Sequence, residues 1–167
     1  MSVRTWRFDS SRAHQMARPY IVLQEKYCPK VWRAWRIGRY LTRLTKEAGL
    51  TPLDDPVHGP QTFRAWCDAD LHAEAGWVTY KKGQGEDWHQ DGDTAPGSRM
   101  DNCMVLWSNR TPTEFRYKNK VYQPKPFQVV LVRNLACHHR RPADAPKRRW
   151  IFRQRVEVPT HIKLPGV

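Results

Sequence analysis

Residues 88–93 read Trp-His-Gln-Asp-Gly-Asp, and they contain two candidate metal ligands on one predicted strand. Side chains of an extended strand alternate between its two faces, so His89 and Asp91 project from the same side and Gln90 from the other. Both can therefore reach one metal ion. The later doublet His138-His139 offers a second imidazole from a distant segment. Two histidines and one carboxylate leave the other coordination positions of the metal open, an arrangement associated with non-haem Fe(II) centres.

On either side of this stretch the sequence has the two-residue period of strands. Short apolar or alternating runs predict strands at 77–80, 87–91, 103–107, 114–117, 121–122, 127–132 and 150–156. Turn-forming residues separate these runs, and the histidine doublet falls in a loop before the last strand. Many short strands after an N-terminal helix predict a mainly β protein with N-terminal helices and a β-sandwich or jelly-roll core.

The N-terminal part contains one long helical pattern. Pro29 or Lys30 is expected to open this helix and Gly49 to close it. Apolar residues near one face are Val31, Trp35, Leu41 and Leu44, and basic residues on another are Arg36, Arg39, Arg43 and Lys46. The basic face suits a phosphate backbone. We favour the other interpretation, a support helix that packs on the sheet with its arginines in water, because apolar helical stripes are usually core.

The length of the chain sets its domain organisation. With 167 residues, 40% of them hydrophobic, it suffices for one domain. Residues 1–75 are expected to form a helical and loop region that packs on the sheet, with a short helix at 63–75, and residues 76–167 the β core. We expect no membrane association, because no apolar run approaches a membrane span and the start lacks a signal-peptide pattern. Cys28, Cys67, Cys103 and Cys137 are widely scattered, which predicts a reducing, cytoplasmic compartment.

The net charge of +13 is unevenly distributed. Residues 1–50 hold 11 Lys and Arg against 3 acids, and residues 111–167 hold 13 against 3, whereas residues 51–110 hold 5 against 10 acids. An acidic middle between two basic flanks suits a cation site in a protein that meets a polyanion such as nucleic acid. The alternative is that the charge only keeps the protein soluble.

The residues that carry chemistry resemble a known superfamily. His89-x-Asp91, a distal histidine about 50 residues later and an arginine that opens the last strand resemble the Fe(II)/2-oxoglutarate-dependent oxygenases. Their core is a double-stranded β-helix, a kind of jelly roll, and the resemblance covers roughly residues 76–156. Tyr80, Gly85, the stretch at 88–93 and Phe152-Arg153-Gln154 are most similar to the nucleic-acid demethylase (AlkB-like) branch. A distal histidine followed by Pro142 is similar to the prolyl hydroxylases.

The resemblance implies an oxidoreductase that uses Fe(II), 2-oxoglutarate and O₂. Its iron ligands would be His89, Asp91 and one member of the doublet. We lean to His138, which precedes Pro142 by four positions and leaves ten residues before Arg149, and we keep His139 as the competing ligand.

The 2-oxoglutarate carboxylate needs a planar cation, for which we expect Arg149, with Arg153 beside it or in its place. Arg155 shares the strand face of both. The hydroxyl of Tyr80 would donate to the same carboxylate.

The resemblance also implies a substrate class. It points to a dioxygenase that hydroxylates or demethylates nucleic acid or a nucleic-acid-associated protein, with Asp93 and Trp88 as the substrate residues. One alternative is a prolyl or other protein hydroxylase. Another is a non-catalytic basic jelly-roll protein that binds nucleic acid, or a cupin-like metal protein without 2-oxoglutarate. The oligomeric state has no signal in the sequence.

Overall fold

The structure, a computed structural model, describes residues 18–52, 65–66, 75–90, 103–133, 137–143 and 149–164; for residues 34–35, 65–66 and 75–80 it describes the backbone alone. The elements in chain order are β1 (Tyr20–Gln24), α1 (Ala34–Glu47), β2 (Thr51–Pro52), β3 (Ala65–Trp66), β4 (Ala75–Tyr80), β5 (Glu86–His89), β6 (Cys103–Ser108), β7 (Glu114–Tyr117), β8 (Lys120–Tyr122), β9 (Val129–Arg133), β10 (His138–Arg141) and β11 (Arg149–Glu157). The prediction of a mainly β protein is confirmed.

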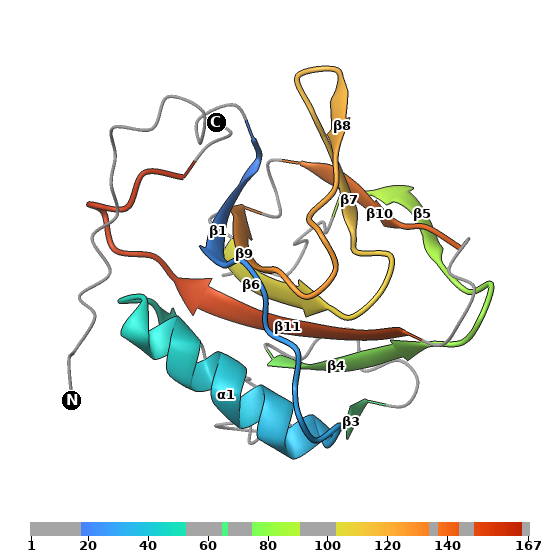
Figure 1. The fold of residues 1–167 in the computed structure, drawn as a ribbon. Helices are drawn as coiled ribbons and strands as arrows, with labels where there is room; N and C mark the ends of the chain where they lie inside the picture. Colours follow the sequence, from blue (N-terminus) through green and yellow to red (C-terminus); the bar gives the residue numbers. More distant parts are fainter. Residues whose placement is uncertain are drawn as a thin grey trace, which may run out of the picture.

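The strands form two sheets (Figure 1). The large sheet has the order β1-β9-β6-β11-β4-β3, with β2 paired to β11, and the small sheet has the order β5-β10-β7-β8. Every pairing is antiparallel except that of β3 with β4. From β4 onward the chain passes back and forth between the sheets, so that β4, β6, β9 and β11 lie in the large one and β5, β7, β8 and β10 in the small one.

Two apolar layers hold these elements together. On one face of the large sheet, Trp107 and Phe152 pack with Leu41 of α1. On the other face, Leu106 packs with Phe115 of the small sheet. Neighbouring residues of β6 thus enter different layers, which is why every residue of that strand is buried. Each large side chain buried in this way contributes roughly 1.5–3 kcal/mol.

Helix α1 covers the large sheet as the support-helix interpretation predicts (Figure 1). Its buried apolar side chains include Ile37, Leu41 and Leu44, and Ala48 just after its end is also buried, whereas Arg36, Arg39, Arg43 and Lys46 are exposed. Gly49 ends the helix with a φ of +77°, as expected of a residue that follows a helix C-terminus. The predicted start was too early, because the helix begins at Ala34, and Val31 precedes it with 41% exposure.

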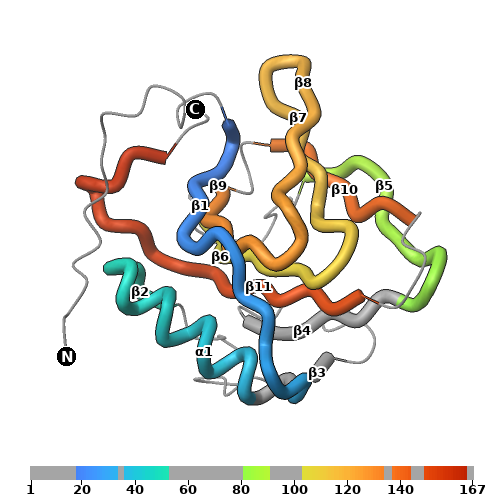
Figure 2. The backbone as a smooth tube through the Cα atoms, viewed as in Figure 1, coloured from blue at the N-terminus to red at the C-terminus, as the bar shows by residue number. Residues whose placement is uncertain are grey.

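The N-terminal region does more than support the sheet. Strand β1 pairs with β9, although more than 100 residues separate them, and β2 pairs with the end of β11 (Figure 2). The predicted helix at 63–75 is wrong at Ala65–Trp66, which form strand β3 beside β4; residues 67–74 lie outside the described part. An apolar run this short has no clear helical or strand period, and residues 65–66 are extended because they pair with the edge of β4.

The predicted hairpin at 114–122 is confirmed as β7 and β8. Tyr117 pairs with Lys120 across a two-residue turn, in which Lys118 and Asn119 have φ values of +47° and +61°. Positive φ at both turn positions matches the right-handed twist of the strands.

In the part of the chain that the structure describes, no helix has the length and apolar character needed to cross a bilayer.

Candidate functional site

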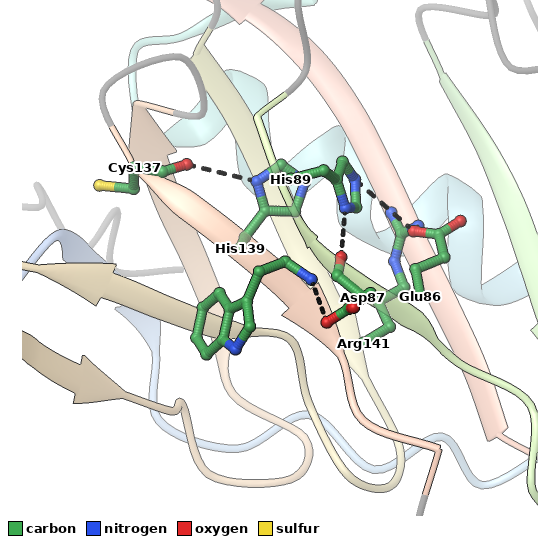
Figure 3. A network of polar contacts seen from close by, with 7 residues as sticks. Glu86, Asp87, His89, Cys137, His139 and Arg141 are labelled. Atoms are coloured by element: carbon green, nitrogen blue, oxygen red, sulfur yellow. Dashed lines mark hydrogen bonds and ion pairs between the residues drawn. The ribbon is translucent and has the colours of Figure 1, made fainter.

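His89 and His139 meet on neighbouring strands of the small sheet. They are directly opposite in the register of β5 and β10, so their side chains lie on the same face. Their ring centroids are 4.4 Å apart, with the planes at 59° to each other (Figure 3). Segments 50 residues apart in the sequence thus bring two imidazoles together, as the sequence predicted for one member of the doublet.

The member of the doublet that meets His89 is the one that we did not favour. His138 lies opposite Arg116 and is exposed, whereas His139 lies opposite Phe115 and is only 2% exposed. The doublet forms strand β10 rather than the predicted loop, and adjacent strand residues point to opposite faces. The preference for His138 is therefore corrected to His139. The sequence of β10 does not alternate between apolar and polar residues, so it does not indicate which of its side chains face inward.

An irregularity in β5 adds two charged side chains to this face. The register advances by two residues on β10, from His139 to Arg141, but by three on β5, from His89 to Glu86. This shift puts Glu86 beside Arg141, and the two form an ion pair in which the Arg141 side chain is 8% exposed. The same Glu86 carboxylate lies 3.8 Å from Nε2 of His89. Sequence reasoning missed both residues, because a bulge has no signal in the residue types here.

Gly85 allows this close approach of the two strands. A Cβ at this position would collide with the backbone carbonyl oxygen of Arg141 and would lie 2.7 Å from the backbone nitrogen of Ala143. Only a residue without a side chain fits, so Gly85 is required by strand packing.

Each imidazole has a backbone carbonyl at Nδ1. Nδ1 of His89 is 2.7 Å from the oxygen of Asp87, and Nδ1 of His139 is 3.4 Å from the oxygen of Cys137. A carbonyl oxygen only accepts, so Nδ1 is the donor in each contact and Nε2 is the ring nitrogen turned away from the backbone carbonyl, the orientation common in metal-binding histidines. Burial raises the pKa of the Cys137 thiol above its usual value, so this group stays protonated near neutral pH.

The predicted carboxylate ligand is not among the residues that the structure describes. Asp91 and Asp93 fall outside the described residues, as does the side chain of Tyr80, whose backbone pairs with Arg149. Among the residues that are described, no three His, Cys, Asp or Glu side chains form a group that could hold a metal ion. Of the three ligands that the sequence predicts, the structure therefore describes only the two histidines.

Strand β11 lines the space opposite the histidine face with arginines. Arg153 pairs with Leu106 and Arg155 with Met104, both of which belong to the layer between the sheets. Alternation puts Arg149 on the same face, as predicted. Arg149 is fully buried and donates from its two terminal nitrogens to the carbonyl oxygens of Thr111 and Gln84, each at 3.0 Å. It therefore ties two connecting segments together, a structural role that the sequence did not suggest.

Trp88 lies on the opposite face of the small sheet from the histidine pair. Its ring is 4.3 Å from the guanidinium of Arg116 and 4.9 Å from that of Arg140, two residues that alternate with the inward-facing ones. Trp88 therefore faces away from His89, because adjacent strand residues point to opposite faces, and its contact with a substrate stays a prediction. No protein-family model, curated protein or solved structure matches the chain.

Proposed function

We propose that the protein is an Fe(II)/2-oxoglutarate-dependent dioxygenase. The observation that carries the proposal is the direct pairing of His89 with His139, both with Nδ1 turned to a backbone carbonyl. Two such imidazoles on one sheet face, with an aspartate two residues after the first, supply the donor types that suit a non-haem Fe(II) site.

The strand order supports a double-stranded β-helix. The eight strands from β4 to β11 divide equally between two facing sheets, in the orders β9-β6-β11-β4 and β5-β10-β7-β8, and only β7 and β8 follow each other within one sheet. In the jelly roll that we propose, the inner faces of both sheets would enclose one interior. In our proposal the histidine pair and the arginines of β11 face each other across that interior.

The donor set fits a divalent metal ion. His89 and His139 would bind through Nε2, since Asp87 and Cys137 hold their Nδ1 atoms, and Asp91 would complete the set. When bound, the metal ion would bring a 2-oxo acid and O₂ together and supply the oxidising chemistry for a C–H bond.

Arg153 is our choice for the carboxylate of 2-oxoglutarate. Arg149 is fully buried, whereas Arg153 is partly exposed on the same inward face, where a cosubstrate can reach it. A guanidinium at that place binds a carboxylate through two parallel hydrogen bonds. Tyr80 pairs in register with Arg149 and keeps its proposed role as a donor to the cosubstrate.

For the substrate we propose nucleic acid or a nucleic-acid-associated protein, because the chain carries a net charge of +13 and α1 exposes a row of basic residues. A second candidate is a non-catalytic binding protein. The observation that favours it is the outer face of the small sheet, where Trp88 lies against Arg116 and Arg140, since aromatic rings among arginines bind single strands.

Succinate formation from 2-oxoglutarate separates the two candidates. A dioxygenase forms succinate only with Fe(II) present, and His139→Ala abolishes this activity while the matched variant His138→Ala retains it. A chain that forms no succinate under any condition, yet binds nucleic acid in a salt-dependent way, would instead be the binding protein. Unfolding curves of both variants show whether each keeps its fold.

A further inference from the structure

A cavity lies on the far side of the large sheet from the histidine pair. Its volume is about 290 Å³, and its lining consists of Trp32, Asn109, Arg110, Phe127 and Trp150. It is found where β6 ends and β11 begins, on the face that packs against α1, since Phe127 and Trp150 both contact that apolar layer. The size approaches that of small-molecule sites, which begin at about 300 Å³.

Three aromatic rings meet edge to face in this cavity. Trp32 lies at 86° to Trp150 with centroids 5.9 Å apart, and at 61° to Phe127 with centroids 6.2 Å apart. Rings that meet at such steep angles enclose an angular recess, or corner, between their planes. A planar group can enter such a corner with its face against one ring and its edge toward another.

Two features suggest that the rings serve a ligand. Trp32 precedes α1 and is 43% exposed, although burial of its large apolar ring would be favourable. Phe127 has a φ of +69°, which is a genuine outlier for a bulky residue, and its backbone is fixed there by hydrogen bonds to Ser108 and Tyr27. Strained positions of this kind cluster at functional sites.

The polar lining indicates the class of ligand. Asn109 is fixed by a 2.8 Å hydrogen bond from the Trp150 backbone to its Oδ1, and the nitrogen of the same amide carries donors of the kind that read a base edge. Arg110 is exposed on the lining, where its charge attracts an anion and repels a cationic ligand such as a quaternary ammonium. We propose that this cavity binds a nucleobase that carries a phosphate, in a free nucleotide or in a single strand.

Calorimetric titration with AMP, adenosine and an adenine oligonucleotide tests this proposal, with neither iron nor 2-oxoglutarate present. Binding of AMP or of the oligonucleotide is expected, with Trp32→Ala at least about fivefold weaker, because a stacked base loses that much or more with its ring. Arg110→Gln is expected to weaken AMP but not adenosine. Val31→Ala, an equally exposed neighbour, is the matched control and should bind as the unsubstituted protein does.

The remaining outcomes either identify the source of the base or overturn the proposal. Equal affinity for AMP and the oligonucleotide supports a free nucleotide, and much tighter binding of the oligonucleotide supports a single strand. Tighter binding of choline than of AMP would overturn the proposal. Unchanged binding by Trp32→Ala would overturn it as well. If only Trp88→Ala lost binding, the nucleic acid would be assigned to the outer face of the small sheet instead. Because no metal is used, the outcome is independent of the dioxygenase proposal.

Discussion

At the scale of single residues, the candidate site depends on Gly85, a residue that has no side chain. Gly85 brings β5 against the backbone of Arg141, and this contact supports the Glu86–Arg141 ion pair next to His89. Loss of the contact would shift the strand that carries the first imidazole.

Gly85→Ala is therefore predicted to destabilise the protein by about 1–3 kcal/mol, the usual effect of overpacking a filled site. Chemical denaturation measures the change. Gly83→Asn is the control, because a Cβ there meets nothing within 4 Å and asparagine tolerates the φ of +77°. Equal stability of the two variants would show that the close approach at Gly85 does not exist.

Arg149 and Arg153 are predicted to respond differently to the same substitution. Arg149→Lys should lower the free energy of unfolding by about 1–3 kcal/mol, because a buried ammonium cannot replace both hydrogen bonds to Thr111 and Gln84. Arg153→Lys should cost less stability than Arg149→Lys, because Arg153 is less buried, and it should raise the KM for 2-oxoglutarate. Denaturation together with succinate assays distinguishes the two roles, and the reverse pattern would make Arg149 the carboxylate ligand.

At the scale of elements, each strand and helix has an inner and an outer face. The apolar period of α1 was visible in the sequence, and its buried face follows it. Leu41→Ala is predicted to cost about 2–5 kcal/mol of stability, as for other fully buried leucines. The matched change Lys46→Ala on the exposed face should cost less than about 1 kcal/mol. Similar costs in thermal or chemical unfolding would mean that the helix does not pack on the sheet.

Part of the fold and of the candidate site could be predicted from the sequence, and part could not. The mainly β class and the hairpin at β7 and β8 follow from local patterns, whereas the approach of His89 to the distal doublet was expected from the order of the motif residues along the chain. The choice between His138 and His139 depends on the register of β10, which is set by its neighbours. Likewise, the position of Glu86 beside His89 depends on the irregularity in β5, and no single sequence reveals a register.

At the scale of the whole molecule, the N-terminal segments complete the large sheet. Strand β1 pairs with β9, and α1 covers Trp107 and Phe152. A fragment of residues 76–167 is therefore predicted to expose this apolar face and to lack a cooperative thermal transition, whereas the full chain should unfold cooperatively. Circular dichroism during heating checks this. A cooperative transition in the fragment would show that the first 75 residues are dispensable for the core.

The central claim is that two imidazoles from distant segments bind one metal ion together. Anaerobic titration with Fe(II) and 2-oxoglutarate tests it most directly, through the weak visible charge-transfer band of the bound 2-oxo acid. The band is predicted for the unsubstituted protein and for His138→Ala, and it should be absent from His139→Ala and from Asp91→Ala. A band that survives in His139→Ala but disappears in His138→Ala would contradict the pairing of His89 with His139.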